Sequence, residues 1–202
     1  MMMNKLPTLL LLAGSAAAIG SAGASDLVLR AGVHNVDPKS DNNAVVHVDS
    51  NATLSLAAEW YFTRNVALDV LGSVPFKHDI RLNADNSKVG SIKHLPPTIS
   101  LQYHFNPGGG FDPYLGAGLN YTLIFDKQTT GALAGTKLSV KNSFGPALQA
   151  GGDFALGKDW LLGIDVRYLW IKAKAAVNGA SIGDVKVDPL VYGVSIGRRF
   201  SL

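Results

Sequence analysis

Apolar and polar residues alternate with a period of two through most of the chain. In WLLGIDVRYLW, residues 160–170, every second residue is large and apolar, and the positions between them include Gly163, Asp165 and Arg167. This is the period of a β-strand, because successive side chains of a strand point to opposite faces. The apolar face of such a strand can lie against a protein core or against a lipid bilayer.

Eight segments carry this alternation. They run over about residues 26–35, 52–64, 66–76, 99–105, 115–123, 144–156, 160–170 and 190–200. The connections after the first, third, fifth and seventh segments are long and polar, whereas those after the second, fourth and sixth are short turns. Long loops at one end and tight turns at the other are typical of outer-membrane barrels, and an even number of antiparallel strands can close without a free edge. We therefore predict an all-β fold, an eight-stranded antiparallel transmembrane β-barrel.

A soluble, lipocalin-like barrel with its apolar face turned inward is the competing interpretation. Two features argue against it. The face opposite the apolar one is rich in Gly, Ser and charged residues, which suits a narrow lumen filled by side chains. Aromatic residues also lie near the ends of the apolar face, as in the girdles of membrane barrels; they are Trp60, Phe62, Tyr103, Phe105, Phe154, Trp160, Trp170 and Phe200.

The N-terminal segment reads as an export signal. One basic residue, Lys5, precedes an apolar run that ends on Ala22, Gly23 and Ala24. This pattern predicts a secretory signal peptide over residues 1–24, cleaved after Ala24, and a mature barrel over residues 25–202. A transmembrane anchor is the alternative, since the stretch is almost long enough to span a bilayer. The roughly 178 mature residues fit one domain.

Composition narrows the picture further. The chain contains no Cys, so an exported protein of this sequence gains no stability from disulfides and depends on burial or on a closed sheet. The net charge of +3, about +2 once Lys5 is removed, gives no reason to expect a nucleic-acid or polyanion partner. The 22 Gly residues suit strands that approach one another closely.

Four stretches together resemble the OmpW family of small outer-membrane proteins: HLPPT at 94–98, PYLGAGLNYT at 113–122, KDW at 158–160 and SIGRRFSL at 195–202. The resemblance covers essentially the whole mature chain. It implies a barrel in the outer membrane of a Gram-negative cell, with a narrow, largely apolar lumen that admits small hydrophobic molecules and releases them sideways into the membrane. The chain continues two residues beyond Arg199 and Phe200, where many relatives end, and its loops do not align, so loop-dependent specificity does not carry over.

The partners expected from this interpretation are the lipid bilayer of the outer membrane and small hydrophobic solutes. The terminal strand also resembles the signal that the outer-membrane assembly machinery reads, which adds that machinery as a partner. We expect no cofactor and no metal site. We also expect no enzyme activity, because no spacing resembles a nucleophile elbow or a zinc motif; His34, His47, His78 and His94 are expected at or above the outer rim.

Inward-facing charges fall in the periplasmic half of the predicted barrel. They form an expected charged layer of Arg30, Glu59, Asp69, Asp153, Asp165, Arg167 and Arg199. Charges inside so narrow a barrel need partners, because an unpaired buried charge is costly. The layer can be a purely structural network, or it can also block the straight route and direct a solute sideways. These two interpretations are compatible.

Above that layer the inward positions are apolar or neutral. The expected upper funnel consists of Ala57, Leu71, Ser73, Ile124, Ala147, Leu169, Ile171 and Val191. Such a funnel favours hydrophobic solutes over ions, which would lose hydration without compensation. The alternative is that side chains fill it completely. The barrel would then be a non-conducting envelope scaffold, or a receptor acting through its extracellular loops.

Three prolines suggest where a lateral exit could lie. Pro75, Pro96 and Pro97 lack amide hydrogens and flank the same outer loop, so neighbouring strands could part there. Alternatively, these residues only mark where the strands end at the loop.

Overall fold

The computed structural model describes residues 26–39 and 45–202, so the expected signal peptide over 1–24 lies outside the described residues. Almost all regular structure in the described part is β-strand. Apart from the 3₁₀ turn η1 (Gly131–Leu133), the elements are β1 (Asp26–Asp37), β2 (Val46–Val48), β3 (Asn51–Tyr61), β4 (Val66–Ser73), β5 (Phe76–Leu82), β6 (Lys88–Leu95), β7 (Thr98–His104), β8 (Phe111–Thr129), β9 (Leu138–Val140), β10 (Ser143–Ala155), β11 (Trp160–Leu169), β12 (Lys172–Val177), β13 (Ala180–Lys186) and β14 (Leu190–Ser201).

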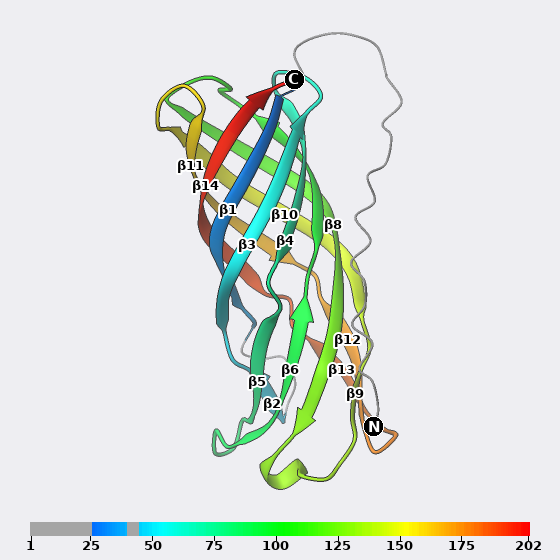
Figure 1. The fold of residues 1–202 in the computed structure, drawn as a ribbon. Helices are drawn as coiled ribbons and strands as arrows, with labels where there is room; N and C mark the ends of the chain where they lie inside the picture. The colour runs from blue at the N-terminus through cyan, green and yellow to red at the C-terminus, as the bar shows by residue number, and fades with distance from the viewer. Residues whose placement is uncertain (1–25, 40–44) are drawn as a thin grey trace, which may run out of the picture.

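Strands β1, β3, β4, β7, β8, β10, β11 and β14 form the barrel (Figure 1). Each pairs antiparallel with its neighbours, and pairing of β8 with β10 closes the ring. The first and last strands also pair, with Ala31 opposite Ile196. The eight predicted segments correspond one by one to these strands, so the predicted eight-stranded barrel is confirmed. Within residues 26–39 and 45–202, no helix is long and apolar enough to cross a membrane.

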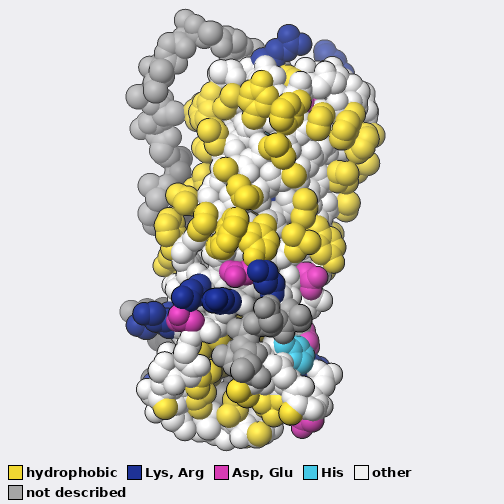
Figure 2. All heavy atoms as spheres, turned by 180° about the vertical axis from the view of Figure 1, so that it is seen from behind, with side chains coloured by type: hydrophobic (Ala, Val, Ile, Leu, Met, Phe, Trp, Pro, Cys, Tyr) yellow, Lys and Arg dark blue, Asp and Glu magenta, His cyan; other side chains and the backbone are white. Residues whose placement is uncertain are grey.

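The outer face of the barrel is apolar because the two-residue alternation turns one side chain of each pair outward. Leu56, Leu115 and Phe144 are each more than half exposed. In Figure 2 such side chains cover much of the barrel on the face shown, charged side chains gather below them, and Lys or Arg side chains also lie at the upper end. This distribution is that of a surface solvated by lipid tails, with charge at the headgroup level.

The long connections are more ordered than the sequence indicated. They are not simply polar loops, because they extend the barrel beyond the membrane band as two sheets (Figure 1). One sheet continues from the outer half of β8 through β6 and β5 to β2, and the other consists of β9, β12 and β13. Most of their charged residues face outward, whereas aliphatic residues such as Ile80, Ile92 and Ala175 face inward. The short turns lie at the opposite end, which in barrels of this type faces the periplasm.

Candidate functional site: a charged lumen beneath an apolar chamber

Arg30 joins two walls of the lumen near the periplasmic end. Its guanidinium donates to Oε2 of Glu59 at 2.6 and 3.0 Å, and to the two carboxylate oxygens of Asp153 at 2.7 and 2.6 Å. All three side chains are buried. A Cβ on Gly163 would lie only 3.0 Å from both Arg30 Nη1 and Asp153 Oδ1, so glycine provides the space for this contact. The guanidinium and the two carboxylates thus supply most of one another's hydrogen bonds and charge compensation.

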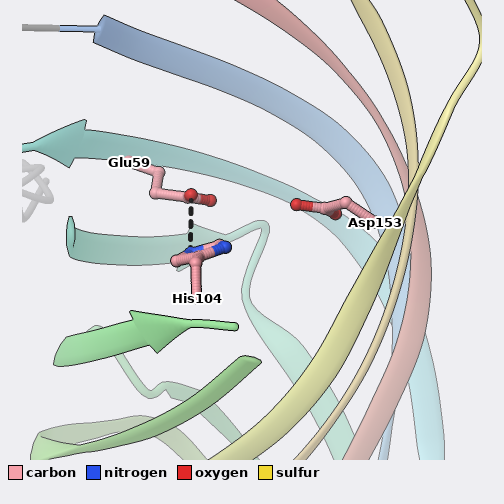
Figure 3. Close-up of side chains that lie close together, drawn as sticks. All are labelled: Glu59, His104 and Asp153. Carbon is pink, nitrogen blue, oxygen red and sulfur yellow. Dashed lines mark ion pairs between the residues drawn. The ribbon is translucent and has the colours of Figure 1, made fainter. Parts of the chain in front are cut away.

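His104 extends this cluster. Its Nε2 lies 3.2 Å from Glu59 Oε1, and its Nδ1 lies 2.9 Å from Asp112 Oδ2. Figure 3 shows Glu59 and His104 facing each other, with Asp153 approaching from another strand. The hydroxyl of Tyr61 lies 3.2 Å from the same ring. The sequence interpretation omitted Asp112 because it assigned residues 106–112 to a turn, whereas β8 already begins at Phe111. It omitted His104 and Tyr61 because only Arg, Asp and Glu positions were counted, although His104 lies on the polar face of its strand.

Glu59, His104 and Asp153 could in principle present three ligand atoms to one metal ion, since these atoms lie within 4.8 Å of one another. However, the Arg30 guanidinium already bonds both carboxylates and supplies the positive charge that a cation would bring. A metal would have to displace this buried cation. The donor set therefore fits an ion-pair network better than a metal centre.

A second charged level lies above the first. Arg167 on β11 donates to Asp69 on β4 at 2.8 Å and to Asp165 at 2.9 Å. Strands β4 and β11 are four places apart in the eight-stranded ring, so the Arg167–Asp69 bond crosses the lumen. His34 belongs to this level: it lies 2.9 Å from Asp165 and 2.6 Å from Ser55 Oγ. The expectation that His34 lies at the outer rim was wrong, because β1 continues several residues beyond it.

Arg199 stands apart from these two levels. It is at the periplasmic mouth, partly exposed, with Nη1 3.8 Å from an Asp26 carboxylate oxygen and its guanidinium over the Tyr61 ring. The seven residues expected to form one charged layer thus occupy three successive levels. Six of them, Arg30, Glu59, Asp69, Asp153, Asp165 and Arg167, are brought together in the two ion-paired levels.

Above the charges the lumen becomes mostly apolar. A narrow cavity of about 10 Å³ is bounded by Leu71, Ser73, Leu169 and Val191. Ala57 lines a second cavity of about 10 Å³ beside the Arg167 level. Among the other residues of the expected funnel, Ala147 and Ile171 pack in the core cluster with Leu169 and Val191. The last, Ile124, lies farther out in a separate chamber.

This outer chamber is enclosed between the two sheets of the extension. A cavity of about 70 Å³ there is lined only by Val, Ile, Leu, Ala and Gly. Val48, Ile80 and Ile92 contribute from one sheet, and Ala175 and Val185 from the other. The sequence interpretation missed the chamber, although alternating aliphatic residues such as Ala173 and Ala175 in the segment KAKAAV were the available signal.

The three prolines lie where barrel strands give way to extension strands. Pro75 lies between β4 and β5, and Pro96 and Pro97 lie between β6 and β7. Pairing of β4 with β7 ends at Leu71 and Thr98, and pairing of β5 with β6 begins at Phe76 and His94. The ladder is therefore interrupted at the prolines. Pro96 is buried and lines the cavity behind this interruption, whereas Pro75 is exposed.

The model of the OmpW family matches residues 22–200. The chain belongs to the OmpW family. It is 36% identical over 203 residues to Outer membrane protein W of Escherichia coli K12, with 94% of each chain covered. Its fold is similar to the crystal structure of OprG from Pseudomonas aeruginosa, with a TM-score of 0.78, 30% identity, and 89% of this chain and 97% of that one covered.

A more distant relative is named for its genetic context. The dibenzothiophene metabolism operon protein PahQ of Pseudomonas aeruginosa is 31% identical over 116 residues, which cover 56% of this chain and 54% of PahQ. Since the relatives are named outer-membrane proteins and the solved structures are outer-membrane barrels, this OmpW-family chain resides in the outer membrane.

Proposed function

We propose that the protein takes up small hydrophobic molecules across the outer membrane, through the outer chamber and the narrow apolar funnel. The observation that carries this proposal is the juxtaposition of an aliphatic chamber with a charged lumen beneath it. The chamber is lined only by aliphatic side chains and glycine, which suits the apolar surface of a small hydrophobic solute. An ion entering it would lose hydration and find no polar compensation.

The relative PahQ supports the same solute class. Its name associates it with dibenzothiophene metabolism, and dibenzothiophene is an uncharged aromatic compound that an aliphatic chamber could accommodate. We carry this chemical class, not the particular compound, over to the present chain.

The exit that we propose is lateral, at the interruption next to Pro75, Pro96 and Pro97. A straight path to the periplasm would require breaking the Arg167–Asp69 bond, which crosses the lumen between buried partners. Because proline has no amide hydrogen, the prolines donate no interstrand hydrogen bond that a solute leaving sideways would have to break. A solute leaving the funnel here would reach the lipid-facing surface beside the exposed Val74. It would then continue in the membrane.

Filling the funnel tests the proposal. Leu71 and Leu169 are replaced by Trp, and accumulation of dibenzothiophene is measured in intact cells that contain no other OmpW-family protein. Wild-type protein is expected to raise accumulation above that of cells without it. In the double variant this increase should be about tenfold smaller, because the Trp side chains fill the path. The matched control replaces Leu101 and Leu148 by Trp, since both face lipid and lie outside the lumen.

Folding of every variant is checked by the heat-dependent shift of its band on gels. A folded wild-type protein that gives no accumulation above the empty cells would overturn the uptake proposal. Equal loss in the lumen and lipid-facing double variants would show that the funnel is not the path. A non-conducting scaffold or a loop receptor would then be the better description.

A further inference from the structure

Two buried histidines lie side by side in the extension. His78 on β5 and His94 on β6 have ring centroids 4.6 Å apart, and they are only 1% and 4% exposed. Phe76 packs against both rings, at centroid distances of 6.2 and 5.4 Å. Neither histidine has a role in the ion-paired levels described above. The burial of two imidazoles in such apolar surroundings requires an explanation, because burying a polar group without a hydrogen-bond partner costs free energy.

Their place along the wall connects the two cavities. Inward-facing residues on β5 follow the order Phe76, His78, Ile80; Phe76 lines the inner funnel cavity and Ile80 lines the outer chamber. On the neighbouring strand, His94 lies between Pro96 of the funnel and Ile92 of the chamber. The histidine pair therefore occupies the wall where chamber and funnel meet. On the proposed uptake route, a solute going from the chamber to the funnel would pass this part of the wall.

The pair lies beyond the membrane band. The residues next to it in sequence, Lys77 and Lys93, point outward, and Lys93 forms an ion pair with Asp126 at 2.7 Å. Charged side chains on the outer surface at this height face headgroups or water and not lipid tails.

The hydrogen bond of His78 shows which of its ring nitrogens can still accept a hydrogen bond. Its Nδ1 bonds the backbone carbonyl of Asp49, which fixes Nδ1 as the protonated nitrogen and leaves a lone pair on Nε2. The Nε2 atoms of both His78 and His94 are buried and have no hydrogen-bond partner in the structure. Burial lowers the pKa of His78, and burial together with the neighbouring His78 ring lowers the pKa of His94 to about 3, so both rings are neutral near pH 7.

The nearby carboxylates are engaged elsewhere. Asp49 bonds Arg81 at 2.7 Å, and Asp79, the neighbour of His78 in sequence, forms an ion pair with Lys88 at 2.7 Å. The residues paired with the two histidines across the strands, Ile92, Phe76 and Ile124, are apolar. The Nε2 atoms of both rings therefore remain available to a polar group of a solute.

We propose that His78 and His94 bind the hydroxyl group of an otherwise apolar solute, so that the protein selects aliphatic alcohols over the corresponding alkanes. The hydroxyl proton would be donated to the lone pair on His78 Nε2, while the hydrocarbon tail extends among the aliphatic side chains of the chamber. This inference rests on the proposed uptake function and adds a polar contact to it. It gives a role to His78 and His94, which an entirely apolar route would not require.

Imidazole nitrogen NMR tests the contact directly. The full barrel, ¹⁵N-labelled at histidine and held in lipid nanodiscs, is titrated with octanol and, separately, with octane. Octanol is expected to shift the Nε2 resonance of His78, because a hydrogen bond to the lone pair changes the shielding of that nitrogen, whereas octane is not. His34 and His104 serve as internal controls, since their rings are already bonded within the charged levels.

Uptake selectivity provides the second measurement. In the same cells as above, His78→Phe and His94→Phe are each expected to lower octanol uptake relative to octane by about threefold to tenfold, the range that one hydrogen bond gives. The matched control is His47→Phe, at a partly exposed position near the outer end. Octane uptake itself is expected to persist, since Phe keeps the wall apolar.

The outcomes separate the two proposals. If wild-type cells take up octane and octanol above background, but the Nε2 resonance of His78 does not respond and selectivity is unchanged in the Phe variants, the polar contact is refuted while uptake stands. If neither compound enters above background, the uptake proposal itself fails. Should a Phe variant not fold, the titration of the wild-type protein still decides the matter.

Discussion

Arg30 illustrates how a single residue links separate walls of the barrel. It bonds Glu59 on the adjacent strand and Asp153 from another part of the ring, and all three are buried. Such a cluster gives little net stability over an apolar core, but removing one member leaves the remaining charges without compensation. The structural and blocking interpretations of this layer therefore rest on the same bonds.

Removing that cation should destabilise the barrel strongly. We expect Arg30→Met to lower the free energy of unfolding by about 3–5 kcal/mol, because buried Asp153 loses its guanidinium partner and buried Glu59 keeps only His104. Urea-dependent folding into lipid vesicles measures this quantity. Arg64→Met, in an exposed periplasmic turn, is the control and should change stability by less than about 1 kcal/mol. Equal stability of the two variants would show that Arg30 is not needed to neutralise the lumen.

At the scale of elements, the extension strands distinguish this barrel from a minimal one. Strands β5 and β6 pair with each other, while the barrel strands β4 and β7 pair below them, and the proline-containing segments interrupt the ladder between the two pairs. Asn120 donates to the carbonyls of both Pro96 and Pro97 at 3.1 Å, which holds this segment in place. The interruption is thus an ordered feature of the wall.

Restoring amide donors there should hinder lateral release. We expect the triple variant Pro75→Ala, Pro96→Ala, Pro97→Ala to reduce dibenzothiophene accumulation about threefold or more, since Ala permits ladder hydrogen bonds where Pro does not. Pro113→Ala, near the periplasmic end of β8, is the control. The measurement is accumulation in cells at equal levels of folded protein. Accumulation equal to that of wild type would contradict an exit at this position.

Considered as a whole molecule, the barrel depends on joining its first and last strands. Strand β14 pairs with β1 along its whole length, from Leu190 opposite Asp37 to Ser201 opposite Asp26. Phe200 lies outward on this strand, partly exposed, with the Arg198 guanidinium over its ring at 5.2 Å. The terminal strand thus serves closure and also resembles the signal for assembly.

These two roles can be separated at Phe200. We expect Phe200→Ala to lower the amount of folded protein in the outer membrane of cells severalfold, while spontaneous folding of the purified chain into thin vesicles changes little, because only the cellular route uses the signal. Val194→Ala, another outward position on β14, is the control. Folding defects of similar size in cells and in vesicles would assign Phe200 a purely structural role.

The alternation of side chains was sufficient to predict the barrel. Residues such as Leu162, Ile164 and Val166 reveal a strand locally, and connection lengths order eight such strands into a closed antiparallel ring. The lumen-facing positions could be predicted as well, because side chains at every second position of a strand point to the same face. This local rule explains why Arg30, Asp69 and Leu71 could be assigned to the lumen from sequence alone.

The amino-acid pattern alone is therefore enough to predict the strands, their lipid-facing and lumen-facing sides, and the family. The folded barrel is needed to see which charges meet across the ring, that His34 and His104 join them, and that the outer connections enclose an aliphatic chamber. The reason is that the alternation of side chains is a property of each single strand. The Arg167–Asp69 bond and the chamber depend instead on strand tilt, on register and on the distance between strands far apart in the chain.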